Sequence, residues 1–438
     1  MNIDTEAYRL VTLLEFKAIT IADAKSEPDN IIYGIPHIGN LGEVEGFQSE
    51  TQDTWGAVNS MILNEGGTST GFSVENYKLV KTIAAIFLNQ SNYSSLVDQY
   101  FIENEIFQWV IAIYKSNKST MSLTTFLEKR IDEEIKNYTY YFKLSPIGIE
   151  NPINFGTVKI FAFTEEYLRA DYDTRNPENR SPWEKHKESF NHILDAIVVE
   201  ITVKAVRSKA EVLAKAEAGL AVNAFKCFFY PESITGHYQV FDLDFRSTEV
   251  IFSKFVTKDN TDGRMKITMQ RVQGTLPIVI KKAMIPTLKK SGLDLIHDFL
   301  INRKHDELHL LILRGIEQLG IAISTRNLHE RIVQLVSYFE LFLNDENNNS
   351  KSKPETNLKN QILPVLVNPN DLEAYKLKIR RIYDVRNKYL HNRILNIIDM
   401  EELFYVQKVA FAFLKQLIKL NETLKTKQQF FIHFGINI

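Results

Sequence analysis

The stretch DLEAYKLKIRRIYDVRNKYLHNR, residues 371–393, predicts one long helix that is both amphipathic and basic. At about 100° per residue, Ile379, Ile382, Arg386 and Tyr389 fall along one side of this helix. Arg386 therefore lies in or beside the apolar stripe. Burying an unpaired guanidinium is costly, so this arginine requires a partner or a function. A solvated basic helix whose arginine lies at a helix interface is the simpler interpretation.

Three further segments predict helices near the C-terminus, so residues 286–438 are expected to form an all-α four-helix bundle. ELHLLILRGIEQLGIAI is strongly apolar, and NLHERIVQLVSYFELFL and EELFYVQKVAFAFLKQLIKLNETL carry apolar residues at helical spacing. Three of the four predicted helices begin with a pair typical of a capping box: Asn327–Glu330, Asn370–Glu373 and Asp399–Glu402. The polar, Asn-rich residues 344–361 predict a mobile loop, more simply an inert insertion than a functional lid.

Residues 1–285 predict a mixture of helices and strands, so the whole chain is expected to be α+β, with a subdomain boundary near residue 145. VENYKLVKTIAAIFLN, SLTTFLEKRIDEEIKNYTYYF and KAEVLAKAEAGLAVNAFKCFF favour helices. TVKIFAF and AIVVEITVKAV favour strands, as do four segments between residues 238 and 280.

The composition is that of an ordinary soluble globular protein, with 44% apolar and 24% charged residues. The single cysteine, Cys227, lies in the apolar run FKCFFY and is expected to be a buried small hydrophobe. No apolar run approaches the ~18 residues of a membrane span, and the N-terminus lacks the basic and apolar regions of a secretory signal. A cytoplasmic protein without membrane contact is expected.

Charge is distributed unevenly along the chain. The formal net charge is -2, yet the residues from Gly320 onward include 17 basic and 12 acidic side chains, a net charge of +5. The preceding residues therefore carry a net charge of -7. A basic C-terminal part joined to a mildly acidic body directs attention to the C-terminal helices.

Two other motifs suggest chemistry only weakly. HDELH, residues 305–309, places two histidines at metal-ligand spacing, but Asp306 stands where a zinc protease requires Glu. A solvated polar helix face is the favoured interpretation, with a metal-dependent hydrolase as the alternative. GGTSTG, residues 66–71, lacks the Lys-Ser/Thr ending of a phosphate-binding loop, so a flexible turn is expected.

RNKYLH, residues 386–391, resembles the R-x4-6-H motif of HEPN-domain proteins. Residues 180–186 and 303–309 also fit the bare pattern, but they lie in a Pro-containing loop and near the start of a predicted helix. Only residues 386–391 lie at the end of the third main helix with another helix after it, as in HEPN domains. RIYDVRNKYLH, preceded by LVSYFELFL and a loop, is similar to the Apea-like branch of this family. That branch often forms the C-terminal domain of prokaryotic anti-phage proteins, and the resemblance covers roughly residues 290–425.

The resemblance implies a metal-independent endoribonuclease that needs no cofactor and acts as a toxin in anti-phage defence by abortive infection. Arg386, Asn387 and His391 would be the catalytic residues. Attack by the 2′-hydroxyl on the neighbouring phosphate would leave a 2′,3′-cyclic phosphate and a 5′-hydroxyl, with tRNA among the expected substrates. Residues binding RNA phosphates would be Lys388, Arg393, Arg380 and Arg381.

The family also implies partners. Residues 386 and 391 differ by about 140° around a regular helix, so they do not converge on one point. HEPN domains usually resolve this by two-fold pairing, and a homodimer through the C-terminal helices is expected. The N-terminal region would sense a phage-derived trigger or regulate the nuclease. A catalytically inactive HEPN protein that binds RNA or serves as a scaffold is the alternative.

Overall fold

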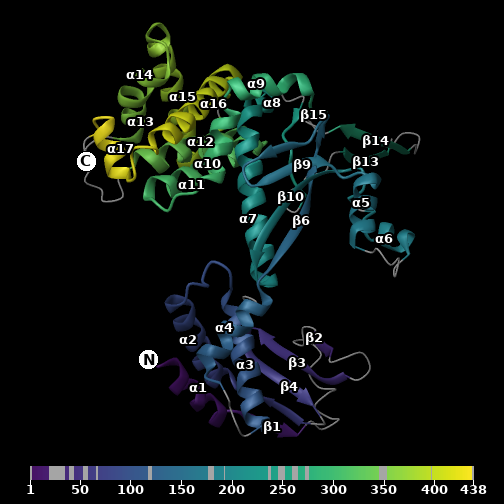
Figure 1. Ribbon diagram of the computed structural model, residues 1–438. Helices are drawn as coiled ribbons and strands as arrows, with labels where there is room; N and C mark the ends of the chain where they lie inside the picture. Colours follow the sequence, from purple (N-terminus) through teal and green to yellow (C-terminus); the bar gives the residue numbers. More distant parts are fainter. Residues whose placement is uncertain are drawn as a thin grey trace. The chain divides into compact units, whose positions relative to one another are not determined.

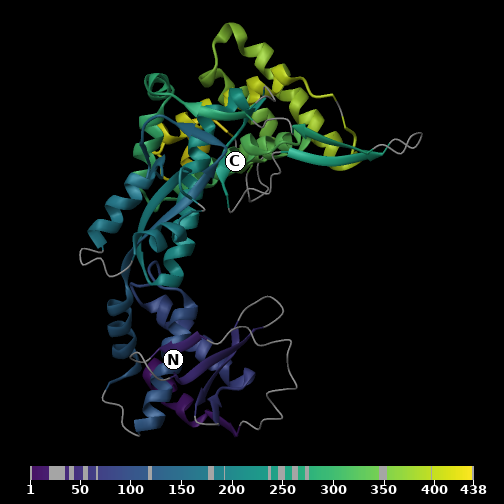
Figure 2. The ribbon, with the colours of Figure 1, turned by 90° about the vertical axis from the view of Figure 1, so that its right-hand side faces the viewer.

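The structure is a computed structural model that describes residues 2–18, 35–38, 44–52, 58–65, 68–116, 121–175, 182–191, 193–234, 238–244, 252–258, 265–271, 276–344, 353–395 and 397–436. The chain is mixed α+β, and its contacts divide it into two compact units (Figures 1 and 2). Unit 1 contains Met1–Tyr138 and Thr202–Leu213, and unit 2 contains Thr139–Ile201 and Ala214–Ile438. The chain passes between the units within β6 (Lys136–Ser145), β10 (Ile197–Ala205) and α7 (Arg207–Lys226).

In the part of unit 1 that is described, an antiparallel sheet with strand order β1-β5-β4-β3-β2 accompanies four helices. Its strands are β1 (Glu15–Ala18), β2 (Ile35–Ile38), β3 (Val44–Gln52), β4 (Val58–Glu65) and β5 (Thr68–Gly71). The helices are α1 (Ile3–Thr12), α2 (Val74–Gln90), α3 (Gln99–Ser116) and α4 (Leu123–Glu134). They bury one core that includes Tyr77, Ile83, Phe107 and Leu127. The predicted helix in VENYKLVKTIAAIFLN is confirmed as α2.

The predicted helix in SLTTFLEKRIDEEIKNYTYYF is only half right. It ends at Glu134 with α4, and β6 begins at Lys136. Tyr138, Thr139 and Tyr140 are aromatic or β-branched, and such side chains lose less freedom on a pleated strand than on a helix. Strand propensity therefore prevails where the apolar spacing alone favoured a helix.

Unit 2 contains a sheet with strand order β12-β6-β10-β9-β8, a parallel sheet with order β11-β15-β7, and an antiparallel β13–β14 pair. In the first of these, the pairs β12–β6, β10–β9 and β9–β8 are antiparallel. The remaining strand bounds are β7 (Ile147–Ile149), β8 (Ile153–Phe155), β9 (Val158–Ala162), β11 (Tyr238–Gln239), β12 (Asp242–Leu243), β13 (Phe252–Lys258), β14 (Met265–Arg271) and β15 (Leu276–Ile280). Two short helices, α5 (Glu165–Arg175) and α6 (Trp183–Ser189), follow β9. Each predicted strand between residues 153 and 280 is confirmed at least in part.

Helix α7 lies along one face of the larger sheet in both ribbon views (Figures 1 and 2). Phe225 packs against Phe155 of β8, with ring centroids 5.3 Å apart. A short 3₁₀ turn and α8 (Tyr230–Ile234) then lead to the C-terminal helices, where Phe228 contacts Phe411 at 5.1 Å. Cys227 is fully buried, as expected. The sheet and the helices therefore share one core.

The C-terminal helices are α9 (Ile285–Lys290), α10 (Leu293–Ile301), α11 (Glu307–Ser324), α12 (Leu328–Leu343), α13 (Pro354–Asn357), α14 (Leu363–Leu366), α15 (Leu372–Asn392), α16 (Met400–Leu420) and α17 (Lys427–His433). The four long helices of the prediction are confirmed as α11, α12, α15 and α16. Asn327 and Asp399 cap α12 and α16 as predicted. The predicted cap at Asn370 is wrong, because α15 starts after a 3₁₀ turn that Asn368 caps instead.

Two boundaries differ from those predicted. Residues 354–366 form α13, a π-helical turn and α14, so the loop expected at 344–361 is wrong from Pro354 onward. Residues 345–352 of the expected loop lie outside the described residues. Leu358 and Ile362 are buried there, which gives this polar segment an apolar anchor. The boundary expected at residue 285 also falls inside unit 2, because α7 and α8 pack on the C-terminal helices.

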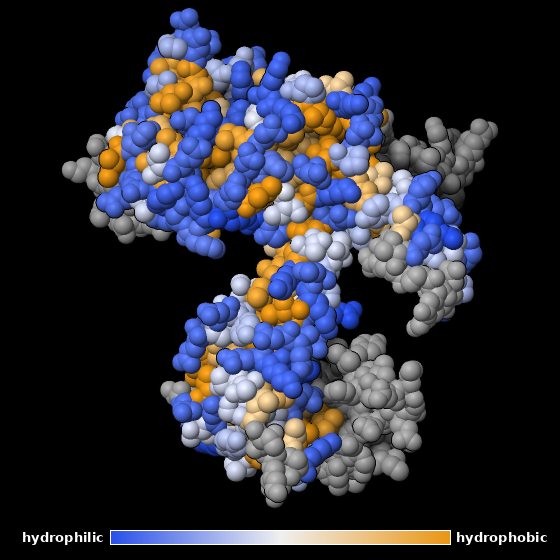
Figure 3. Space-filling model, viewed as in Figure 1, coloured by the Kyte–Doolittle hydropathy of each residue, from blue (hydrophilic) through white to orange (hydrophobic). Residues whose placement is uncertain are grey.

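The surface of unit 2 seen in Figure 3 is mainly hydrophilic, with hydrophobic patches between the charged residues. Among the described residues, no helix combines the length and the apolar character needed to cross a membrane.

Candidate active site

Helix α15 carries the predicted catalytic residues and contacts both α12 and α16 (Figure 1). Its buried side is formed by Tyr375, Ile379, Ile382 and Tyr383. The helix ends at Asn392. Arg393 follows with a left-handed φ of 54°, and its N–H donates to carbonyls of the last helical turn. The helix is thus regular through both positions of the R-x4-6-H motif.

Arg386 has a partner on the neighbouring helix. Its Nη2 donates to Oε2 of Glu340 in α12 at 2.9 Å, and its Nη1 donates to Oδ1 of Asn387 at 2.9 Å. The side chains of Arg386 and Glu340 are 22% and 28% exposed, so the pair lies at the edge of the core. The structure thus brings Arg386 and Asn387 together and supplies the counter-charge that an arginine in this stripe requires.

The surroundings of this pair hold hydrogen-bond donors that are not satisfied. The Tyr383 hydroxyl and Nε of Arg386 are buried without a partner among the described residues. Burial raises the pKa of Glu340, while the charge of Arg386 opposes that rise. Burial also raises the pKa of Tyr383, which keeps its hydroxyl proton available for donation. The cluster of Glu340, Tyr383 and Arg386 can therefore accept a further oxygen ligand.

His391 lies apart from Arg386. It is exposed on the last turn of α15, and no hydrogen bond joins it to Arg386 within the described part of the chain. Between them in the sequence, Tyr389 packs against His329 of α12, with ring centroids 5.1 Å apart and ring planes tilted by 31°. One chain therefore does not bring the arginine and the histidine of the motif to a common point, as the 140° offset predicts.

The basic residues of α15 fall into two groups. Arg381 pairs with Glu402, and Lys378 pairs with Glu401 at 2.8 Å while lying 3.5 Å from the ring centre of Tyr405. These charges are largely compensated by α16. The predicted RNA-binding residues that remain exposed without an ion pair in the described chain are Arg380, Lys388 and Arg393. Lys388 and Arg393 place positive charge available to a phosphate at the end of α15, next to His391, whereas Arg380 lies near the middle of the helix.

A set of exposed apolar side chains surrounds that same end. Four residues, which we call the α15 terminal patch, are exposed by 40% to 100%: Leu390, Ile394, Leu395 and Ile397. Apolar side chains gathered on a surface mark an interaction site more often than isolated ones do. The charged end of α15 is thus bordered by a surface suited to contact with another protein.

Sequence reasoning missed Glu340, Tyr383 and His329 as neighbours of the motif. Glu340 did carry a signal, because it stands between the apolar residues Phe339 and Phe342 in a strongly apolar helix. Tyr383 precedes Arg386 by three residues on the same helix face. No pattern in the sequence pointed to His329.

The other motifs have structural roles. His309 is fully buried, and its ring centroid lies 4.2 Å from that of Phe299. Its Nδ1 lies 3.1 Å from Oδ1 of Asn421. Asp306 caps α11 by accepting from the His309 N–H. The polar face expected for HDELH is therefore wrong at His309, since this side chain faces the core. Within the described residues no group of three potential metal ligands occurs.

Of the three remaining motifs, two are only partly described. Residues 68–71 of GGTSTG form β5 instead of a turn, and residues 66–67 lie outside the described chain. Arg180, the first residue of the motif at 180–186, also lies outside the described residues. Arg303, which begins the motif at 303–309, forms an ion pair with Glu217 of α7.

The burial of His309 predicts a loss of stability in mild acid. Desolvation lowers its pKa from 6.5, so below about pH 6.5 the unfolded chain binds a proton that the folded chain does not. Stability should therefore fall as the pH drops from about 7.5 to about 5.5. We expect His309→Gln to reduce this dependence in thermal unfolding followed at both pH values. The exposed His305→Gln is the control, and an equal effect of both substitutions would contradict the assignment.

No protein-family model, curated protein or solved structure matches this chain.

Proposed function

We propose that the chain is a metal-independent endoribonuclease of the HEPN type that cleaves RNA in anti-phage defence. The observation that supports this most is the arrangement at the end of α15. Arg386 and Asn387 are hydrogen-bonded to each other, and an exposed His391 follows on the same helix next to uncompensated positive charge. These are the residue types and the order that the HEPN motif requires.

The helical part of unit 2 supports a HEPN bundle. Helices α11 and α15 each contact both α12 and α16, the motif ends the third of these four helices, and α16 follows. Tyr338, Phe342 and Phe413 are fully buried between α12 and α16, with Tyr338 donating to the Ala410 carbonyl at 3.1 Å. A core of this kind holds α15 rigidly enough to carry a catalytic site.

The residues divide the chemistry between them. Histidine is the side chain whose ordinary pKa lies nearest neutrality, so His391 takes the proton of the attacking 2′-hydroxyl or gives one to the leaving 5′-oxygen. Arg386 stabilises the charge that develops on the phosphate oxygens, since its planar fork matches them. Asn387 holds the guanidinium. Glu340 orients Arg386 through their ion pair. When RNA binds, a phosphate oxygen must replace part of the contact between Glu340 and the guanidinium.

A second copy of the chain completes the site in this proposal. Arg386 faces α12 and His391 faces outward, so the two meet only across an interface. The α15 terminal patch supplies an apolar surface for isologous contact, and the adjacent Lys388 and Arg393 bind RNA phosphates on its border. Unit 1 and the sheet of unit 2 would sense the phage-derived trigger.

A catalytically inactive RNA-binding or scaffold protein is the second candidate. The observation that favours it is the Arg386–Glu340 ion pair, because an arginine already neutralised by a carboxylate binds phosphate less strongly. RNA binding without any cleavage products, with or without infection, would support this candidate over the first.

The nuclease proposal predicts that His391→Ala lowers RNA cleavage by about 10²–10⁴-fold, the usual contribution of a general acid or base. Purified protein is incubated with tRNA and a synthetic RNA in EDTA, and the ends of the products are analysed. The wild type should leave 2′,3′-cyclic phosphates. His305→Ala, at another exposed histidine, is the matched control. Equal cleavage activity of the wild type and His391→Ala would contradict the proposal. Growth arrest that is equally strong when the wild type and His391→Ala are expressed would also contradict it.

A further inference from the structure

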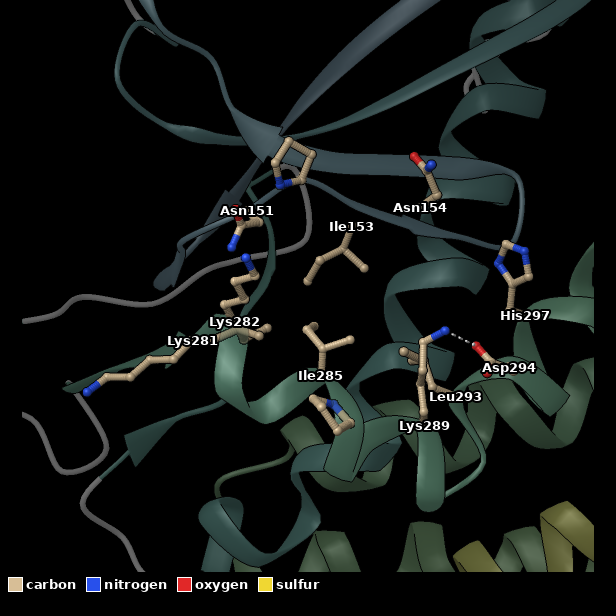
Figure 4. Close-up of a pocket in the computed structure, with 13 residues that line it drawn as sticks. Asn151, Ile153, Asn154, Lys281, Lys282, Ile285, Lys289, Leu293, Asp294 and His297 are labelled. Carbon is tan, nitrogen blue, oxygen red and sulfur yellow. Dashed lines mark ion pairs between the residues drawn. The ribbon is translucent and has the colours of Figure 1, made fainter.

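A cavity of about 650 Å³ lies in unit 2, away from the residues of α15. It is formed where the β7–β8 turn and the end of β15 meet α9 and α10 (Figure 4). Its volume falls in the range of sites for small molecules, roughly 300–1,000 Å³. None of the residues assigned to RNA cleavage lines it, so its ligand is a separate question.

The middle of the cavity is apolar. In Figure 4 the side chains of Ile153 and Ile285 face each other from the strand and the helix, with Leu293 close by. Pro152 and Pro286 extend the same walls. A gap bordered by aliphatic side chains on two sides suits a flat apolar group, because both faces of that group lose contact with water there.

One end of the cavity is cationic. Figure 4 shows Lys282 and Asn151 pointing toward each other at this end. The backbone N–H of Lys282 donates to Oε2 of Glu150 at 2.8 Å, which fixes the start of the helical segment that carries it. No ion pair neutralises the ammonium of Lys282 or of the neighbouring Lys281 in the described part of the chain. An anionic group is the ligand chemistry that suits this end.

The opposite end offers both donors and acceptors. Nδ1 of His297 accepts the N–H of Gly156 at 2.9 Å, so the ring proton lies on Nε2. Asp294 lies beside it and pairs with Lys289 at 3.4 Å (Figure 4). This combination can hydrogen-bond a heterocycle edge that carries both N–H groups and ring nitrogens.

We propose that this cavity binds a purine nucleoside monophosphate. The phosphate lies against Lys282 and Asn151, the base lies between Ile153 and Ile285, and its polar edge reaches Asp294 and His297. The phosphate, the faces of the base and the polar edge of the base each meet a matching part of the cavity. A simple anion uses only one end, and an apolar ligand leaves both ends unpaired.

The test is isothermal titration calorimetry on the full chain with AMP and GMP. Adenosine, guanosine and inorganic phosphate are titrated in parallel. We expect saturable binding of at least one nucleotide, with the matching nucleoside and phosphate alone each about tenfold weaker or worse, since each lacks one set of contacts. Lys282→Glu should weaken nucleotide binding by about tenfold or more. Lys290→Glu reverses an exposed charge at the end of α9, outside the cavity, and should bind as the wild type does.

Three results would overturn the assignment. One is the absence of saturable binding of either nucleotide at millimolar concentration. Another is phosphate that binds as tightly as the nucleotides, which indicates a general anion surface. The third is equal weakening by Lys282→Glu and Lys290→Glu. Both lysines are exposed, so both variants should unfold at the wild-type temperature, and this is checked by thermal denaturation.

Discussion

Mixing Arg386→Ala chains with His391→Ala chains is expected to restore RNA cleavage that neither variant has alone. If the active site takes its arginine from one chain and its histidine from the other, each mixed dimer contains one intact site. A mixed dimer has one of its two sites intact, so isolated mixed dimers should recover roughly half of the wild-type activity. The structural basis is the regular α15, which directs Arg386 toward Glu340 and leaves His391 exposed.

The two variants are co-expressed with different affinity tags, and mixed dimers are isolated through both tags. Light scattering reports their mass, and cleavage is measured in EDTA. Each variant expressed with a differently tagged copy of itself is the control, and it should stay inactive. Mixed dimers that form but do not cleave would show that each site lies within one chain. Recovery in the mixed dimers would exclude an inactive scaffold at the same time.

Gly320→Ala is expected to destabilise unit 2 by about 2 kcal/mol. This is opposite in sign to the usual effect, because replacing a glycine within a helix by alanine ordinarily stabilises a protein by roughly 1 kcal/mol. A Cβ at Gly320 in α11 would lie 2.7 Å from Cα of Asn223 in α7. Because the obstructing atom belongs to the backbone of a buried helix, no side-chain rotation relieves the clash. The two helices must separate, and the contacts beside the glycine loosen.

Thermal unfolding measures this effect, and we expect the midpoint to fall by several degrees. Ile321→Ala is the matched control, since the neighbouring Ile321 is 45% exposed and its truncation removes little packing. A Gly320→Ala variant as stable as the wild type would show that α7 and α11 do not approach as closely as described.

The sequence predicted the long helices well because their apolar periodicity is local. α7, α11, α12, α15 and α16 all occur where spacing and composition favour them. Caps were predictable where a single Asn or Asp decides the start of a helix, as at Asn327. The start of α15 was mispredicted because a 3₁₀ turn intervenes, and its proline-containing geometry competes with a simple cap.

The division into units was not predictable, because it depends on contacts between distant segments. Phe228 and Phe411 are far apart in the chain, and nothing in the local pattern of either tells which partner it meets. The same holds for the candidate site. The order of Arg386 and His391 is visible in the sequence, whereas the ion pair with Glu340 depends on how α12 crosses α15.

Arg393, which follows the last residue of α15, has a strained backbone conformation. Its backbone has a left-handed φ of 54°, a conformation in which glycine is relaxed and a side-chain-bearing residue loses about 1 kcal/mol. Glycine would end the helix with less strain, so folding alone does not favour arginine at this position. The Arg393 side chain is exposed, and its guanidinium carbon lies 5.9 Å from the ring centre of Tyr389. The left-handed residue that ends α15 therefore also places a positive charge beyond the last helical turn, where a glycine would leave none.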